Sequence, residues 1–119
     1  SGNNLIDLFA YLIRKYGRMD TSEYARIMQL KTSELRGAIL AIGGMSAMEW
    51  RNRYLLLEAQ ELMERTDMSI TAIAAKLGFS HPSVFSKFFR TLTKSQPWEW
   101  RIEKKKPGSN RKRTYHCYE

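Results

Sequence analysis

The stretch ITAIAAKLGF, residues 70–79, followed by SHPSVFSKFFRTLT, residues 80–93, decides the fold of this chain. Its apolar residues recur three and four positions apart, which predicts two amphipathic helices with one buried face each. Ser69 is the expected N-cap of the first helix, and Gly78 ends that helix in a left-handed conformation. Pro82 stands in the first turn of the second helix, where proline is tolerated. A short helix, a tight turn and a longer helix form a helix-turn-helix unit.

The same layout occurs about 50 residues earlier in the chain. Ala25 corresponds to Ala74, and Leu30 corresponds to Phe79, both at an offset of 49. The small alanine lets the two helices of a unit approach closely, and the larger residue fills the corner of the turn. The longer helices correspond at an offset of 50, so one residue is inserted in or just after the turn, where insertions are tolerated. This internal repeat predicts two helix-turn-helix units.

Periodicity and capping residues predict about seven helices and no strands. The expected helices run over about 5–16, 21–28, 32–42, 46–65, 70–77, 81–92 and from 97 onward. Four N-caps are expected, at Asp20 with Glu23, at Thr32, at Ser46 with Glu49, and at Ser69. The apolar faces are expected to bury, among others, Leu8, Ile42, Val84, Phe85, Phe88, Phe89 and Trp100.

We therefore predict an all-α fold, with two helix-turn-helix subdomains joined by a long linking helix. The expected segments are an N-terminal helix with the first subdomain (3–45), the linking helix (46–65), the second subdomain (66–104) and a basic flexible tail (105–119). A helix of roughly 20 residues is about 30 Å long. Reading helices on one face of DNA lie about 34 Å apart, so this length favours DNA binding over a helical bundle without a DNA role.

The composition excludes several classes of protein. The chain has 119 residues, of which 43% are hydrophobic, and this suffices for a real core. No apolar run approaches the ~20 residues of a membrane span, and no signal peptide is present, so we expect a cytoplasmic protein without a membrane partner. The single cysteine, Cys117, cannot form an internal disulfide, and His81 and His116 are too isolated to bind a metal. No cofactor is expected.

The charge is uneven along the chain. The net charge is +8, and residues 101–119 hold seven basic and two acidic residues, whereas residues 1–100 hold thirteen and ten. A basic tail either binds anions or only keeps the chain soluble, so charge alone is a weak argument for nucleic acid. Non-specific RNA binding through the tail is a remote alternative.

Three segments carry a family resemblance. Residues 70–79 (ITAIAAKLGF), 85–90 (FSKFFR) and 97–101 (PWEWR) fit the patterns I-x-x-I-A-x-x-x-G-F, F-S-R-x-F-K and P-x-x-Y-R. With these segments the chain resembles the AraC/XylS family of bacterial transcription regulators over roughly residues 19–101. The linking helix also fits, through Trp50, Ala59, Leu62 and Met63. The resemblance implies the DNA-binding domain of a transcription factor.

The departures from this family lie mostly in the first half. Gly37 stands where an arginine is usual, Leu40 replaces a lysine, and Leu55 replaces an arginine of the linking helix. Lys94 stands where a glycine is usual before the turn at Pro97. We therefore expect the first unit to contact DNA weakly or to act mainly as a support.

A reading helix presents the outward residues of its N-terminal half to base edges. The base-reading candidates are Thr32, Ser33, Arg36 and Gly37 in the first unit, and His81, Pro82, Ser83, Ser86 and Lys87 in the second. Only Arg36 in the first unit can make a bidentate contact to guanine. The resemblance implies base-reading or nearby phosphate contacts for Ser83, Ser86 and Lys87. Each candidate can also be an ordinary solvated surface residue.

Four arginines are candidates for contacts to DNA phosphates, which give affinity and salt dependence but no sequence choice. They are Arg51, Arg53, Arg90 and Arg101. For Arg101 a structural role under Trp98 or Trp100 is the alternative.

The sequence thus predicts specific binding to double-stranded DNA and transcription regulation, with two reading helices in successive major grooves. The alternative is a helical protein-interaction module that keeps the helix-turn-helix shape without reading DNA. An enzyme is not expected, because no nucleophile is paired with a base and no phosphate-binding glycine loop is present. RNA polymerase and an upstream sensor domain of the same native chain are possible partners. The start Ser1-Gly2, without methionine, favours a piece of a longer protein.

Overall fold

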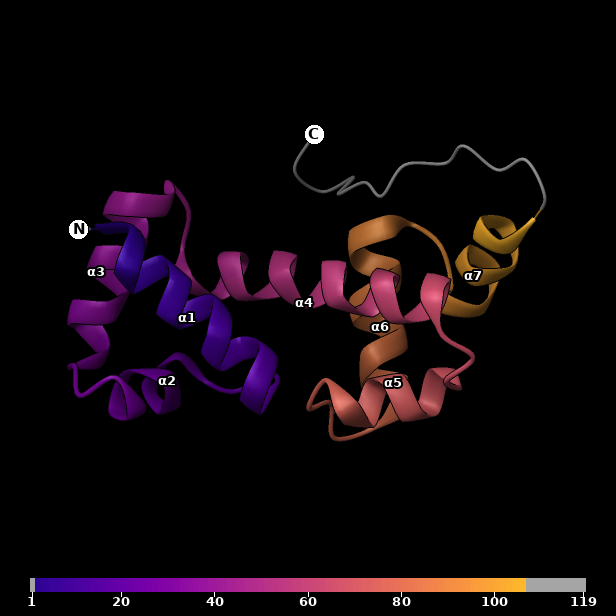
Figure 1. The fold of residues 1–119 in the computed structure, drawn as a ribbon, viewed down its shortest axis with the longest axis horizontal. Helices are drawn as coiled ribbons and strands as arrows, with labels where there is room; N and C mark the ends of the chain where they lie inside the picture. The colour runs from indigo at the N-terminus through magenta and orange to yellow at the C-terminus, as the bar shows by residue number, and fades with distance from the viewer. Residues whose placement is uncertain (1, 107–119) are drawn as a thin grey trace. The chain divides into compact units, whose positions relative to one another are not determined.

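We describe residues 2–106 of the chain from a computed structural model, in which every regular element is an α-helix (Figure 1). The helices are α1 (Gly2–Tyr16), α2 (Thr21–Ile27), α3 (Thr32–Gly43), α4 (Ala47–Arg65), α5 (Ile70–Lys76), α6 (Pro82–Thr93) and α7 (Pro97–Lys105). This confirms the predicted all-α fold and the order of its helices. Of the predicted basic tail (105–119), only residues 105 and 106 are described. His116 and Cys117 lie outside the described residues.

The chain divides into two compact units, Ser1–Leu55 and Leu56–Glu119. The boundary lies inside α4, so the first half of this helix belongs to unit 1 and the second half to unit 2. Unit 1 contains the helix-turn-helix pair α2 and α3, and unit 2 contains the pair α5 and α6. The predicted linking helix therefore contributes residues to both units.

The core of unit 1 forms where α1 and α2 pack on α3. Phe9, Tyr24, Leu35 and Ile39 are fully buried. The rings of Phe9 and Tyr24 meet edge to face at a centroid distance of 5.2 Å, and Phe9 lies 5.6 Å from the ring of Trp50 on α4. These aromatic contacts join α1 and α2 to the first half of α4.

The core of unit 2 is built around aromatic residues of α6. Phe85 and Phe89 are fully buried, and Phe89 meets Trp100 of α7 edge to face at 5.9 Å. Phe79, in the turn before α6, lies 5.2 Å from Phe85 and 5.0 Å from Phe88. Phe79 thus fills the corner of the turn, as the sequence predicts.

The two helix-turn-helix turns have the same backbone geometry. The amide of Leu30 donates to the carbonyl of Ala25 at 2.9 Å, and the amide of Phe79 donates to Ala74 at 3.0 Å. Gly78 takes the expected left-handed conformation with φ 87°, and the matching residue of unit 1 is Gln29 with φ 60°. A left-handed glutamine is not predictable from the sequence pattern, in which only the second turn has a glycine at this position.

The predicted caps divide into two groups. Ser46 and Ser69 are caps as expected: Ser46 Oγ accepts from Glu49 N at 3.1 Å, and Ser69 Oγ accepts from Ala72 N at 3.0 Å. Asp20 is the N-cap of α2 as expected, although its side chain makes no cap hydrogen bond. The prediction for Thr32 was wrong by one residue, because Thr32 is already helical and Lys31 is the N-cap of α3. The amide of Lys31 donates to Glu34 Oε1 at 2.7 Å, so a glutamate side chain satisfies the amide of this N-cap residue.

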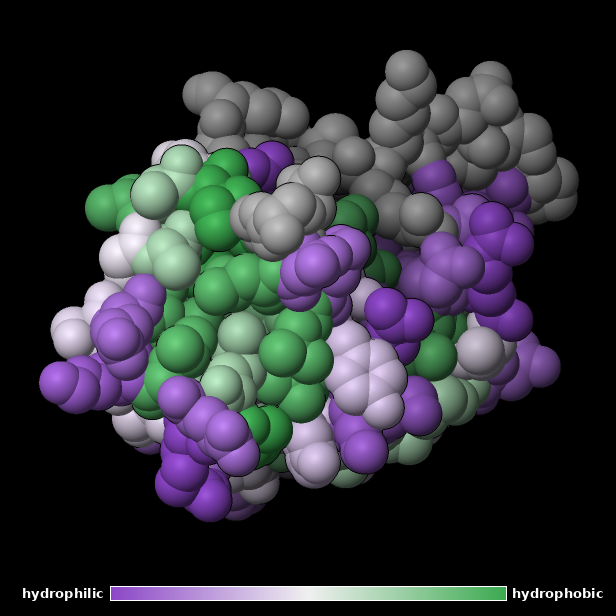
Figure 2. All heavy atoms as spheres, turned by 60° about the vertical axis from the view of Figure 1, so that its left-hand side comes forward, coloured by the Kyte–Doolittle hydropathy of each residue, from purple (hydrophilic) through white to green (hydrophobic). Residues whose placement is uncertain are grey.

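Some residues predicted to face inward lie at the surface. Leu8 is 43% exposed, Ile42 41% and Val84 37%. Their apolar helix faces are wider than the helices that cover them, so the edge of each face stays in solvent. Figure 2 shows a group of apolar side chains on the surface that faces the viewer.

A buried glutamine interrupts the core of unit 2. Gln60 of α4 is fully buried, and neither its Oε1 nor its Nε2 has a hydrogen-bond partner within residues 2–106. A buried polar group without a partner loses its hydration and gains nothing in return.

Replacing this glutamine by an apolar residue of similar size should stabilise the protein. We expect Gln60→Met to raise the free energy of unfolding by about 1–2 kcal/mol, measured by urea denaturation with circular dichroism. Gln60→Glu is the matched control with the opposite sign, because it places a charge at the same buried site. A loss of stability in Gln60→Met would contradict this account.

The backbone at the C-terminal ends of α3 and α6 explains why a glycine is favourable at position 94, where this chain has a lysine. Lys94 is left-handed with φ 66°, and its amide donates to Arg90 O at 2.8 Å. The matching residue of unit 1 is Gly44, with φ 73° and an amide bond to Leu40 O of 3.0 Å. A residue with a Cβ is strained in this conformation, whereas glycine is not.

Exchanging the residue types at these two positions should therefore have opposite effects. Lys94→Gly is expected to raise the free energy of unfolding by about 1 kcal/mol, and Gly44→Lys to lower it by a similar amount. A Cβ at Gly44 would meet no atom within 4 Å, so only backbone strain is added there. Equal signs for the two variants in thermal denaturation would refute this explanation.

Candidate nucleic-acid interface

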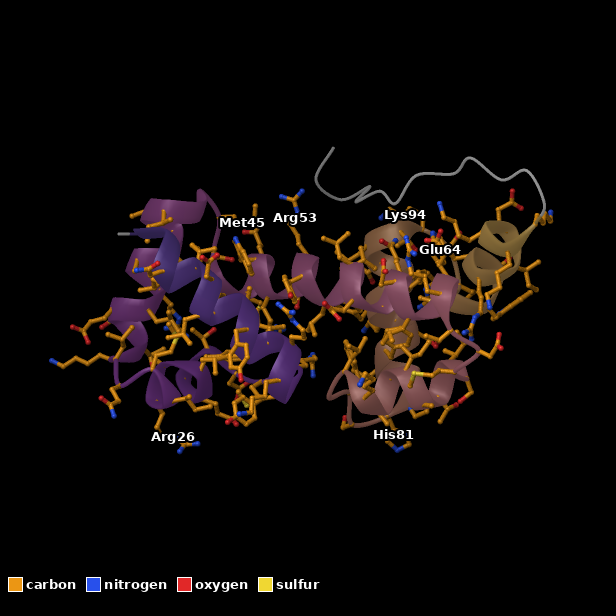
Figure 3. All side chains as sticks on the ribbon, viewed as in Figure 1. Arg26, Met45, Arg53, Glu64, His81 and Lys94 are labelled. Atoms are coloured by element: carbon orange, nitrogen blue, oxygen red, sulfur yellow. The ribbon has the colours of Figure 1, made fainter. Side chains whose placement is uncertain are left out.

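The N-terminal half of α6 presents the predicted reading residues of unit 2 on one exposed surface. His81, Pro82, Ser83 and Lys87 are exposed, and Ser86 is half-buried. His81 extends away from the ribbon just before α6 (Figure 3). On the opposite face of the helix the buried phenylalanines fix its position against the unit, so the exposed side chains have a rigid base.

Helix α3 presents the corresponding surface of unit 1. Ser33, Arg36 and Gly37 are exposed and Thr32 is half-buried, while Leu35 on the opposite face is fully buried. The structure adds Leu40 to this surface, because its side chain is 57% exposed. From the sequence, Leu40 was identified only as a departure from the family pattern. Its spacing from Arg36, four residues along a helix, was the signal that places both on one side.

A hollow of about 400 Å³ lies beside this surface. Its lining residues come from the beginning of α2, from α3 and from the beginning of α4: Thr21, Arg36, Leu40, Ser46, Ala47 and Met48. Arg36 is therefore a cation at the edge of a depression in unit 1.

The structure contradicts the predicted phosphate contact of Arg51. Its side chain is buried, with 8% of the residue exposed. Nη1 donates to the carbonyl of Met19 at 2.8 Å, and Nε and Nη2 donate to Asn52 Oδ1 at 3.1 and 2.8 Å. Burial, followed by the charge of Arg18, lowers the pKa of the Arg51 guanidinium below its ordinary value. A guanidinium held in this way is occupied by contacts within unit 1 and has little surface left for a phosphate.

Arg101, which is also a predicted phosphate contact, binds backbone carbonyls of its own unit. Its Nε donates to Met63 O at 3.0 Å, Nη2 donates to Thr66 O at 2.7 Å, and Nη1 donates to Met68 O. These carbonyls include those at the end of α4, which lack partners within the helix. The structural alternative was correct for this residue, although carbonyl oxygens rather than tryptophan rings hold it.

Arg51 and Arg101 are the same element of the internal repeat. Their offset is 50, and the methionine carbonyls that they bind, of Met19 and Met68, differ by 49. Each methionine stands immediately before the N-cap of the first helix of a helix-turn-helix pair. We call this interaction the arginine clamp: it fixes the point at which the chain enters each pair.

The amides of the two methionines are satisfied by different side chains. In unit 1, Met19 N donates to the hydroxyl of Tyr24 at 3.0 Å, and this hydroxyl donates to Gly17 O. Burial raises the pKa of Tyr24, so it stays a neutral donor. In unit 2, Met68 N donates to Thr66 Oγ1 at 3.2 Å. A tyrosine in unit 1 and a threonine in unit 2 thus each supply a hydroxyl acceptor for the methionine amide.

The remaining two arginines stay phosphate candidates. Arg90 on α6 is exposed. Arg53 on α4 is half-buried, with Nη1 3.9 Å from the sulfur of Met45, and both residues are labelled in Figure 3. Within the described part of the chain, no three histidines, cysteines or acidic residues are grouped as metal ligands, and no helix is long and apolar enough to cross a membrane.

Removing the clamp of unit 2 should destabilise the protein strongly. We expect Arg101→Met to lower the free energy of unfolding by about 3 kcal/mol, because the carbonyls of Met63 and Met68 lose their charged donor. The carbonyl of Thr66 also loses one, but keeps the bond from Lys105 Nζ. Arg90→Met is the control, and its exposed position should keep the change within about 0.5 kcal/mol. Equal effects of the two variants on chemical denaturation would show that the clamp is not structural.

Two units, each with an anchored and partly exposed second helix, define a double helix-turn-helix protein. A family model described as a helix-turn-helix domain matches residues 24–102. The chain belongs to the AraC-type helix-turn-helix family, whose members are DNA-binding transcription regulators, as the sequence analysis expected.

The chain is also similar in sequence or fold to known regulatory proteins and DNA-binding domains. The regulatory protein PocR of Salmonella typhimurium is 40% identical over 58 residues, which are 49% of this chain and 19% of PocR. The DNA-binding domain of AdpA, solved with a target DNA, is 21% identical with a TM-score of 0.75, over 88% of this chain and 97% of that one. A transcriptional regulator with an AraC-type DNA-binding domain from Chromobacterium violaceum is 23% identical with a TM-score of 0.71, over 89% and 93%.

Proposed function

We propose that this chain binds double-stranded DNA at specific sequences and regulates transcription, with α3 and α6 in successive major grooves. The observation that carries the proposal is the repeated arrangement of an anchored second helix with an exposed N-terminal half. An α-helix with its side chains is about 10–12 Å wide and fits the major groove, which is about 12 Å wide. The solved complex of the AdpA domain with its target DNA supports this reading.

The candidate contacts divide by chemistry. Arg36 is suited to the acceptor pair of guanine, and Ser33, Ser83, Ser86 and Lys87 offer hydrogen bonds to base edges or to nearby phosphates. Thr32, His81, Pro82 and Gly37 shape the same surfaces. Arg53 and Arg90 supply contacts to phosphates. The net charge of +8 favours these contacts and makes the affinity fall as salt rises.

The chain spans 19% of the length of PocR, so the activity of a whole protein is a further proposal. We propose that it is cytoplasmic, that it has no enzymatic activity, and that a sensor domain upstream in the native chain controls it. RNA polymerase is the proposed protein partner. Trp98 and Ile102 of α7 stand four residues apart and are 59% and 56% exposed, which offers an apolar contact for such a partner.

Binding-site selection from a random duplex library, followed by fluorescence anisotropy, tests the proposal. The wild-type chain should bind its selected duplex with an affinity that falls steeply with salt. The double variant Arg36→Ala/Lys87→Ala should bind that duplex about 10- to 100-fold more weakly, because one bidentate base contact alone is worth about 1–3 kcal/mol.

The matched control is Arg14→Ala/Arg65→Ala, which removes two exposed cations from α1 and α4 and leaves both reading helices intact. It should lose much less affinity. Unchanged affinity in Arg36→Ala/Lys87→Ala, or no sequence preference above bulk DNA, would instead favour a helical protein-interaction module.

A further inference from the structure

Packing within residues 2–106 gives no reason for a glycine at residue 37. It lies in the interior of α3, where glycine is less favourable than alanine. A Cβ built on it would meet no atom within 4 Å. Gly43 of the same helix differs, because its Cβ would meet the Trp50 side chain at 3.2 Å. Packing within the described residues therefore accounts for Gly43 but not for Gly37, and glycine also serves where a backbone must approach a ligand closely.

Leu40 stands beside this glycine on the exposed side of α3. Ser33, Gly37 and Leu40 are spaced four and three residues apart, so they form one stripe along the helix. Leu35 and Ile39, on the other side, are fully buried. The outward stripe thus combines a hydroxyl, a gap and a leucine that is 57% exposed.

This combination fits one feature of the major groove. Among the bases, only thymine presents an apolar group there, the C5-methyl, whereas the other edges present donors and acceptors. A leucine side chain can pack on this methyl but cannot make a hydrogen bond. A glycine next to it removes the side chain that would otherwise hold the helix away from the base.

We propose that α3 reads thymine through its C5-methyl group, with Leu40 packed on the methyl and Gly37 allowing the close approach. The proposal rests on the proposed DNA binding and gives unit 1 a direct reading role. Arg36 borders Leu40 on the same hollow, which places a cation for a guanine or a phosphate beside the apolar contact. This mixed surface suits a base edge better than an apolar protein segment.

The sharpest probe is deoxyuridine, which pairs like thymidine and lacks only the methyl group. In the duplex selected by the wild-type chain, thymidines are replaced one at a time by deoxyuridine, and affinities are measured by anisotropy. At one thymidine or more the wild type should bind about four-fold more weakly, as expected for one methyl group left in water. Leu40→Ala should bind the two forms of that duplex equally.

Leu8→Ala is the matched control, since it truncates a leucine of the same unit that is 43% exposed on α1. It should keep the four-fold preference for thymidine. Gly37→Ala separates folding from binding: it should raise the melting temperature by a few degrees through helix propensity and weaken binding of the selected duplex at least four-fold.

Three results would overturn the inference. These are a selected duplex in which no methyl group matters, a methyl effect that survives in Leu40→Ala, and full binding by Gly37→Ala. Each leaves the proposed DNA binding in place and would assign the Leu40 surface to another partner, such as a protein. If the chain selects no duplex at all, both the proposed function and this inference fail.

Discussion

Both helix-turn-helix pairs depend on a guanidinium that binds backbone carbonyls. Arg51 and Arg101 each come from the helix that follows a pair, and each binds the carbonyl of the methionine that precedes it. These two carbonyls lie in the connections before α2 and α5, and in a partly buried place they need a donor. The planar, always charged guanidinium can supply several donors at once, which a lysine ammonium cannot do in the same geometry. The clamps therefore fix the points at which the chain enters α2 and α5, the first helices of the two pairs.

The internal repeat reaches further into the structure than its sequence suggests. The turns, the left-handed residues, the clamps and the tryptophans before them all recur at an offset of 49 or 50, as Trp50 and Trp100 show. The side chains at equivalent positions often differ. The two units thus share their backbone geometry more closely than their side chains. Different side chains accept from equivalent backbone amides, as Tyr24 does for Met19 N and Thr66 does for Met68 N.

The all-α fold, the order of the helices and the turn at Gly78 could be predicted, because they follow from periodicity and from residues with restricted conformations. The roles of the arginines could not, because Arg51 and Arg101 find their partners 32 to 38 residues away. A local pattern shows a charge but not whether it faces solvent. The same limit applies to Leu40, because its exposure depends on which helices cover α3. It applies also to Gln29, because a left-handed conformation is expected from sequence mainly at glycine.

The division of α4 between the two units has a consequence for how such a chain is built. The first half of α4 corresponds to α7, since both carry a tryptophan followed by the clamp arginine, and the second half corresponds to α1. One helix is thus the last element of one period and the first of the next. Neither period can be cut out cleanly, so an autonomous copy of either one needs the whole of α4.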